Sequence, residues 1–223
     1  KLTDITIFSF HAVKNITTAE GGAICLNLPQ SFNNEEEYRI MKLYTLNGQN
    51  KDAFTKSQAG GWKYDILFAG LKVNMPDICA AIGLAQIKKY NEVLLVERER
   101  VARRYYAFFS QYPFFQLPLL EDSDRKSCFH LYALRINSIT EDQRDLIIEN
   151  VTTTGVSVNV HFIPMPMLTV FKDRGYKIEN YPIAYNNYAR EISLPIYPQL
   201  TNEEVDYICD SILTSYQKVI NND

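Results

Sequence analysis

Two short apolar segments near the amino terminus predict a pair of strands joined by a polar loop. Residues 3–10 alternate polar and apolar side chains, which is typical of a half-buried strand, and residues 23–28 form an apolar run that Pro29 closes. The loop between them ends in two glycines. Residues 31–46 place apolar side chains at helical spacing before Asn47 and Gly48, so a helix is expected there.

The next segment predicts a long loop followed by two helices. Residues 48–70 lack periodicity, and a loop of this length in a compact domain is usually functional or lies at an interface. Asn74 can cap a helix that begins at Asp77, with Pro76 in its first turn. This helix carries an apolar stripe formed by Ile78, Ala81, Ile82 and Ala85. Its small residues, such as Gly83, suit close packing against another segment. A second amphipathic helix is expected from residue 97 to about 112.

The remaining chain predicts a small α/β unit. Residues 131–136 have the composition of a strand, and residues 140–143 form a capping box that opens a helix ending at Gly155. Alternating valines over residues 156–160 predict another strand. A second capping box at residues 201–204 opens a final amphipathic helix.

Composition and charge narrow the class of protein. The 223 residues are 46% hydrophobic and 22% charged, with a net charge of −3, so the basic field of a nucleic-acid binder is missing. No apolar run approaches the roughly 20 residues that cross a bilayer, and we expect a cytoplasmic protein. The four cysteines include no C-x-x-C pair, and three of them are expected to be buried free thiols. With three isolated histidines, no metal site is predicted.

Lys14 is the strongest candidate for chemistry, because it follows an apolar strand within a loop rich in hydroxyls. An amine held in a partly dry site is nucleophilic enough to form an imine with an aldehyde. The hydroxyls of Thr17 and Thr18, together with main-chain N–H groups, could hold a phosphate. From the residues alone, a solvated loop lysine remains the simpler interpretation.

Several segments resemble the DegT family of aminotransferases, which use pyridoxal 5'-phosphate (PLP) and act on nucleotide-linked keto-sugars. The resemblance rests on residues 9–22, 62–65, 70–77, 80–86, 130–132, 160–162 and 192–195. It implies an α/β protein of fold type I, the aspartate-aminotransferase type. Residues 1–95 would be the carboxyl-terminal part of the large PLP-binding domain, and residues 96–223 the small C-terminal domain.

The resemblance also implies roles for individual residues. Lys14 corresponds to the lysine that forms an imine with PLP and then moves protons between substrate and cofactor. Ser9 matches a serine that bonds the cofactor phosphate, and Asn74 an asparagine that reaches the phosphate of the neighbouring subunit's site. His161 corresponds to a position near the nucleotide-sugar pocket. No chemical step is assigned to His11, for which a packed, hydrogen-bonded histidine is expected.

The resulting prediction is an aminotransferase that moves an amino group from glutamate, which becomes 2-oxoglutarate, to a UDP- or dTDP-linked keto-sugar for polysaccharide biosynthesis. A homodimer with shared active sites is implied, and no membrane or nucleic-acid partner. Lys14 argues against the family's dehydratase branch, which has histidine there. The aspartate that bonds the ring nitrogen would lie upstream of residue 1, so a non-catalytic fragment that folds and dimerises stays an alternative. A PLP-dependent transcription regulator would need an added DNA-binding domain.

Overall fold

The computed structural model describes residues 3–51, 56–59 and 62–221, and the chain divides into two compact units. The first unit spans Lys1–Tyr90 and the second Asn91–Asp223. The domain limits expected from the sequence, 1–95 and 96–223, stay a proposal. Within the described residues, no helix combines the length and the apolar character that a membrane span requires.

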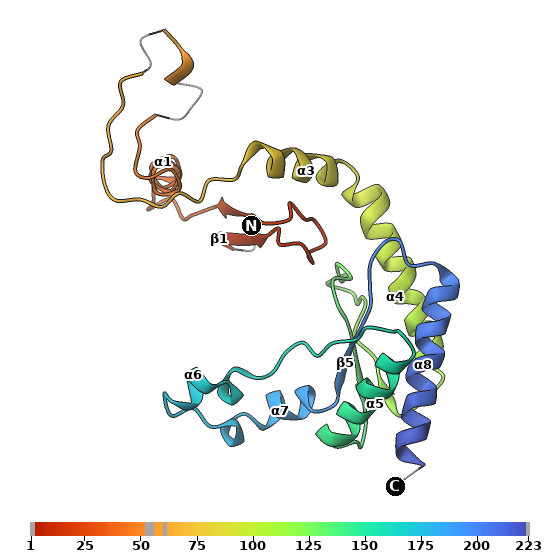
Figure 1. Cartoon of the computed structure of the whole chain (residues 1–223). Helices are drawn as coiled ribbons and strands as arrows, with labels where there is room; N and C mark the ends of the chain where they lie inside the picture. The colour runs from red at the N-terminus through yellow and green to blue at the C-terminus, as the bar shows by residue number, and fades with distance from the viewer. Residues whose placement is uncertain (1–2, 52–55, 60–61, 222–223) are drawn as a thin grey trace. The chain divides into compact units, whose positions relative to one another are not determined.

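The first unit opens with an antiparallel hairpin (Figure 1), as the two predicted strands require. Strand β1 (Ile5–Ser9) pairs with β2 (Gly22–Leu26), and the last residue of β1 lies opposite the first of β2. Both candidate residues of the amino-terminal motif are therefore positioned by one hairpin. Ser9 ends β1, and Lys14 belongs to the loop that joins the two strands.

Helix α1 (Asn34–Thr45) confirms the helix predicted over residues 31–46. The side chain of Asn33 caps it by accepting from two main-chain N–H groups of the first turn. The chain then returns along the end of α1, where Gly48 has a left-handed backbone with φ of 72°. A Cβ at Gly48 would lie 2.0 Å from the carbonyl oxygen of Phe68, so this close approach of two segments requires glycine.

Helix α3 (Asp77–Lys88) departs from two expectations. Pro76 occupies the N-cap position without a side-chain cap, and Asn74 does not cap the helix, because its Oδ1 accepts from the Lys72 ammonium instead. The apolar stripe is not buried: α3 has no buried residue within the described chain, and Ile78 is 77% exposed. The small residues do allow close packing, as the lysine loop described below shows.

The second unit is a three-stranded antiparallel sheet, ordered β3-β4-β5, with helices packed against it. Its main elements are α4 (Leu95–Phe109), β3 (Phe115–Gln116), β4 (Tyr132–Ile136), α5 (Glu141–Thr153), β5 (Glu191–Leu194) and α8 (Asn202–Ile220). A short π-helix, η1 (Tyr90–Leu94), precedes α4. Short helical segments lie between α5 and β5: η2 (Met165–Met167), α6 (Thr169–Lys172), η3 (Ile178–Asn180) and α7 (Pro182–Tyr188).

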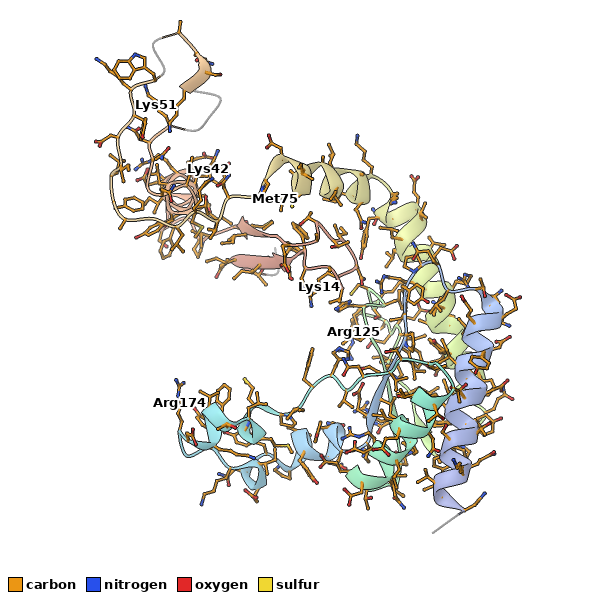
Figure 2. All side chains as sticks on the ribbon, in the orientation of Figure 1. Lys14, Lys42, Lys51, Met75, Arg125 and Arg174 are labelled. Carbon is orange, nitrogen blue, oxygen red and sulfur yellow. The ribbon has the colours of Figure 1, made fainter. Side chains whose placement is uncertain are left out.

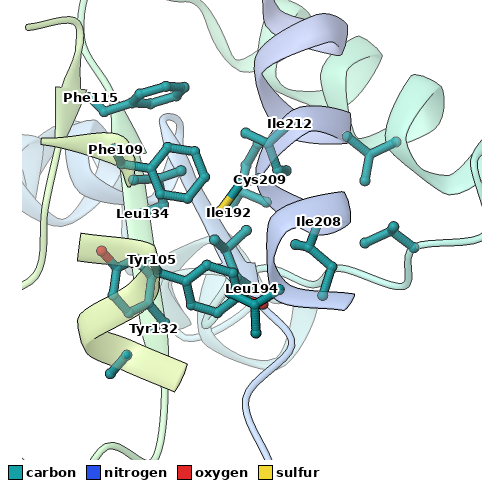
Figure 3. Close-up of a cluster of buried hydrophobic side chains, with 14 of the residues drawn as sticks. Tyr105, Phe109, Phe115, Tyr132, Leu134, Ile192, Leu194, Ile208, Cys209 and Ile212 are labelled. Carbon is teal, nitrogen blue, oxygen red and sulfur yellow. The ribbon is translucent and has the colours of Figure 1, made fainter. Parts of the chain in front are cut away.

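The hydrophobic core of this unit lies between the sheet and helices α4 and α8 (Figure 3). Tyr105 and Phe109 of α4 meet Tyr132 of β4, and Cys209 and Ile212 of α8 lie in the same cluster. All five side chains are fully buried. Helix α8 packs against both α4 and α5, so one amphipathic helix contacts two other helices of the unit.

Both predicted capping boxes are confirmed. The Thr140 hydroxyl accepts from the main chain of Gln143, whose side chain bonds back to Thr140, and Thr201 and Glu204 do the same at the start of α8. Gly155 follows α5 with φ of 83°, the left-handed conformation expected of a residue that ends a helix.

The strand predicted over residues 156–160 is wrong. This segment makes one isolated bridge, between Asn159 and Ser193. An antiparallel ladder would continue through residue 195 on one side, but Pro195 has no N–H to donate. On the other side, the N–H of His161 bonds to the side chain of Glu191 at 2.9 Å rather than to a main-chain carbonyl.

The cysteine expectation is also wrong in part. Only Cys209 is buried, whereas Cys25 and Cys128 are exposed and Cys79 is intermediate. All four are free thiols. Apolar neighbours in the sequence did not decide burial, because Cys25 lies in the two-stranded hairpin, most of whose residues are exposed.

Candidate active site

The loop that carries Lys14 is held in one conformation by main-chain hydrogen bonds. The N–H of Phe10 donates to the carbonyl of Gly21 at 2.8 Å, and the N–H of Thr18 donates to the carbonyl of Phe10 at 2.9 Å. Within the loop, the N–H of Lys14 donates to the carbonyl of His11 at 3.0 Å, forming a tight turn. The turn places Lys14 at the end of the hairpin (Figure 2).

The two threonine hydroxyls serve the loop itself, which corrects the expectation that they could hold a phosphate. The Thr18 hydroxyl donates to the carbonyl of Glu20 at 2.7 Å, and the residue is 1% exposed. The Thr17 hydroxyl donates to the carbonyl of Phe10 at 3.3 Å and accepts from the N–H of Ala19 at 3.0 Å. These bonds stiffen the segment next to Lys14.

Helix α3 supports the lysine loop from outside. A Cβ at Gly83 would lie 2.8 Å from Cγ2 of Thr18, so the loop approaches the helix closely where the side chain is smallest. Gln86, one turn further on, accepts from the N–H of Thr17 at 3.4 Å. The side chain of Met75, just before the helix, also reaches the loop at Gly21. The exposed helix therefore has a local function, which is to hold the lysine loop in place.

The candidate cofactor residues of the first unit differ in their surroundings. Lys14 is partly buried, and its ammonium makes no hydrogen bond or ion pair with any residue in the described ranges. Ser9 is exposed, and its Oγ lies 3.4 Å from the main-chain nitrogen of His11. Asn74 is exposed, and its N–H is tied to the end of α1 by a bond of 3.1 Å to the carbonyl of Thr45.

His11 is less packed than expected. Its side chain is 49% exposed, and its Nε2 lies 3.7 Å from a carboxylate oxygen of Glu20 across the loop. An exposed contact of this kind contributes little to stability. The histidine borders the lysine loop but is not part of a buried network.

His161, in the second unit, lies at the end of a chain of polar groups that continues into the sheet. Its Nδ1 is 2.7 Å from the Ser193 hydroxyl, which in turn donates to a carboxylate oxygen of Glu191. The other oxygen of Glu191 accepts from the His161 N–H at 2.9 Å. Burial raises the pKa of the Glu191 carboxyl, against the lowering effect of the bonds from Ser193 and His161 and of the nearby charge of Arg144.

This chain of polar groups borders a small cleft of about 390 Å³ within the second unit. Its walls include His161, Phe162, Arg135 and Tyr188. Phe162 packs edge-on against the His161 ring, with centroids 4.5 Å apart. Arg135 donates to the side-chain oxygen of Asn187 at 2.5 Å, so the cleft combines aromatic surface with positive charge.

The structure therefore groups Ser9 and Lys14 on one hairpin, Asn74 on the segment that leads into α3, and His161 at its own cleft in the second unit. Sequence reasoning predicted close packing at Gly83 but not that the lysine loop is its partner, and it missed the position of Glu191. The signal for Glu191 was its place two residues before Ser193 on a strand, which puts both side chains on the same face of the sheet.

Comparisons with known proteins identify the family of this chain. The family model for the DegT/DnrJ/EryC1/StrS aminotransferase family matches residues 1–213. The spore coat polysaccharide biosynthesis protein SpsC of Bacillus subtilis is 34% identical over 215 residues, which cover 94% of this chain and 53% of SpsC.

Solved structures extend the likeness to the fold. "Putative sugar aminotransferase Spr1654" of Streptococcus pneumoniae, in its PMP-form, superposes with a TM-score of 0.90 at 39% identity, covering 98% of this chain and 54% of that one. Its PLP-form gives 0.88. Helicobacter pylori PseC, an aminotransferase involved in the biosynthesis of pseudoaminic acid, gives 0.81 at 30% identity, covering 97% and 54%.

The chain spans about half the length of the curated relatives that it matches. The family match nevertheless includes the lysine loop, α3 and the second unit as far as residue 213, and the Spr1654 structure covers 98% of this chain. This chain therefore belongs to the DegT/DnrJ/EryC1/StrS aminotransferase family, and its fold is that of the family's PLP-dependent sugar aminotransferases.

Proposed function

We propose that the protein is a PLP-dependent aminotransferase that transfers an amino group from glutamate to a nucleotide-linked keto-sugar. The observation that carries the proposal is a partly buried lysine, Lys14, on a loop fixed against α3, in a chain of the DegT/DnrJ/EryC1/StrS aminotransferase family. The relatives SpsC and PseC act in the biosynthesis of spore coat polysaccharide and pseudoaminic acid. A nucleotide-linked sugar with a UDP or dTDP carrier and a 3- or 4-keto group is the substrate class proposed here.

The residues present fit the cofactor. Lys14 offers an amine without a partner among the described residues, and Ser9 offers an exposed hydroxyl at the end of the same strand. When bound, PLP supplies an aldehyde that condenses with an amine and a ring that accepts electrons from the substrate carbon. Thr17 and Thr18 are occupied within the loop, so Ser9 is the hydroxyl left to bind a phosphate oxygen.

Lys14 has two tasks in this proposal. Its amine would hold the cofactor through the aldehyde group and so fix the position of the ring. Once the amino group of glutamate has taken that place, the freed Lys14 amine would take up a proton from the substrate and return it. Both tasks require a nitrogen that returns to the same place, which a loop with internal bonds and support from Gly83 provides.

Imine formation tests the role of Lys14. We expect the protein mixed with PLP to develop a visible absorption band, and borohydride reduction to leave the cofactor on the peptide that contains Lys14. Lys14→Ala should abolish both results. Lys42→Ala, at an exposed lysine of α1, is the matched control and should retain them. Labelling that persists in Lys14→Ala would refute the assignment.

A homodimer with shared sites is part of the proposal, since Asn74 is expected to reach the phosphate bound by the neighbouring subunit. Lys14→Ala and Asn74→Ala should each be defective as pure homodimers. A mixed dimer of the two would carry one site with both changes and one site with neither, so mixing and exchange of subunits should restore cofactor binding. If mixing restores nothing although mixed dimers form, Asn74 acts within its own subunit.

The alternative is a chain that folds and dimerises without binding the cofactor productively. It predicts dimers by sedimentation but no visible band with PLP at any concentration tested.

A further inference from the structure

The polar chain behind His161 contains enough hydrogen bonds to decide where the protons lie. Glu191 and Ser193 are 5% and 4% exposed, so water does not complete their hydrogen bonding in the way it does for surface groups. The Glu191 carboxylate receives one donor on each oxygen: the Ser193 hydroxyl on Oε1 and the main-chain N–H of His161 on Oε2. Arg144 adds a positive charge nearby, and it donates to the main-chain oxygen of Glu191 at 3.3 Å.

The Ser193 hydroxyl has one hydrogen, and this limits what it can do. When Glu191 is ionised its carboxylate is an acceptor only, so the hydroxyl hydrogen of Ser193 points at Glu191. The same oxygen lies 2.7 Å from Nδ1 of His161 and has no second hydrogen to give. The bond between them therefore exists only if Nδ1 carries the hydrogen and Ser193 accepts it.

We infer that Glu191 and Ser193 are positioning residues that hold His161 in the form protonated on Nδ1, so that the neutral ring presents Nε2 as a hydrogen-bond acceptor. The carboxylate orients the serine, and the serine orients the ring. In this form Nε2 accepts from a hydroxyl or an N–H group, whereas a phosphate oxygen has only lone pairs and is not bound by it.

The cleft beside the ring gives this inference a consequence for recognition. Resting on the proposed function, it assigns His161 to a hydroxyl or N–H group of the nucleotide-linked sugar rather than to the diphosphate of the carrier. Arg135, on another wall of the cleft, has the opposite chemistry and can only donate. The proton position itself does not depend on that function, because it follows from the bonds within the protein.

Nitrogen NMR of ¹⁵N-histidine-labelled full chain tests the inference without any activity. The chain has only three histidines, and His161→Gln identifies the signals of this ring. On the alkaline side of the ring's titration, we expect Nδ1 to give the signal of a protonated nitrogen and Nε2 that of an unprotonated one. The reverse pattern would overturn the inference.

Glu191→Gln gives the sharpest result, because it should move the hydrogen of the His161 ring from Nδ1 to Nε2. The main-chain N–H of His161 still needs an acceptor, so the new amide oxygen takes the place of Oε2. Its NH₂ group then faces Ser193 and donates, and the serine hydrogen turns to Nδ1. The hydrogen of the ring moves to Nε2, and the two nitrogen signals should exchange their character. A Glu191→Gln protein that keeps the original pattern would show that the carboxylate does not set the proton.

Ser193→Ala is the second variant, and it removes the link while changing little volume. Nδ1 then loses its acceptor, and we expect a mixture of both ring forms in place of one. Ser211→Ala, at another buried serine of the same unit, is the matched control and should leave His161 unchanged. The signals of His11 and His130 should stay constant in every variant and report that the chain is folded. A single unchanged form in Ser193→Ala would contradict the inference.

Discussion

Two neighbouring tyrosines in the core of the second unit should respond in opposite ways to the loss of a single oxygen atom. Tyr105 and Tyr132 are both fully buried, with ring centroids 5.0 Å apart, and burial raises the pKa of both phenols. The Tyr105 hydroxyl donates to the carbonyl of Pro195 at 2.8 Å. The Tyr132 hydroxyl has no hydrogen-bond partner among the described residues.

Replacement by phenylalanine keeps each ring and removes only the hydroxyl. In Tyr105→Phe the carbonyl of Pro195 loses its donor while it stays partly buried, which costs about 1–3 kcal/mol of unfolding free energy. In Tyr132→Phe the lost hydroxyl had given up its water without gaining a bond, so stability should stay equal or rise by about 1 kcal/mol. The two variants therefore differ in sign although the chemical change is identical.

Urea unfolding followed by far-UV circular dichroism measures both, because α4, α5 and α8 give the second unit most of its helical signal. The slope of the free energy with urea should match the wild type, which shows that the change lies in stability and not in the amount of surface exposed. Equal losses in both variants would refute the reasoning, since they would mean that Tyr132 also has a partner. If Tyr105→Phe left the free energy of unfolding unchanged, the hydrogen bond to Pro195 would contribute nothing measurable to stability.

Three further predictions concern the lysine loop, the core thiol and the surface of α8. Gly83→Ala adds a methyl group 2.8 Å from Cγ2 of Thr18, so the gain of about 1 kcal/mol in helix propensity is outweighed by a packing cost of about 1–3 kcal/mol. Hydrogen exchange at the Thr18 amide should therefore speed up. Adding Thr18→Ser, which removes Cγ2, should restore the slower exchange. Burial raises the pKa of the Cys209 thiol to about 12, so a thiol reagent at neutral pH should modify it only after unfolding, and rapid reaction of the native protein would contradict the core described here. The hydrogen bond from Arg104 lowers the pKa of Asp206, so the carboxylate binds its proton less readily in the folded protein than in the unfolded one. The contribution of Asp206 to the free energy of unfolding is therefore present above the ordinary aspartate pKa and is lost as the pH falls through the lowered value. Asp206→Asn should flatten the acid side of a stability profile measured by urea unfolding across pH.

The elements predicted best from the sequence are helices whose ends are fixed by local capping residues. Thr140 and Thr201 each start a helix through bonds to a residue three positions later, and no distant contact is needed to form them. Gly155 ends a helix for a similarly local reason, because its backbone is left-handed. Local signals of this kind survive in any tertiary context.

The failures arose where the folded conformation of the chain, and not the local sequence pattern, decides which groups bond to each other. The valines of residues 156–160 have the composition of a strand, yet Pro195 and the side chain of Glu191 end the ladder after one bridge. The threonines beside Lys14 had the chemistry of a phosphate site, and their hydroxyls are used by carbonyls of the loop. Glu191 lies 30 residues from His161, whereas the Thr18 hydroxyl bonds to a carbonyl only two residues away, which the folded conformation of the loop brings into reach.

The candidate site residues could be predicted from the sequence, but the residues that hold them in place could not. The resemblance pointed to Lys14, Ser9, Asn74 and His161, and their roles stay a proposal. The positions that support them follow from the fold: Gly83 lies 65 residues from Thr18 of the loop it supports, and Glu191 of β5 reaches His161 from 30 residues away. Such second partners determine whether an amine or an imidazole stays in one place, and only the structure reveals them.

The exposed face of α3 also governs how the protein will behave at high concentration. Large apolar side chains on a short helix attract one another in water, while a net charge of −3 gives little mutual repulsion to keep molecules apart. Added salt weakens that repulsion further, so light scattering should grow with ionic strength in concentrated samples. Spectroscopic work on the ring nitrogens is therefore best carried out in dilute buffer at low salt, where colloidal association is slowest.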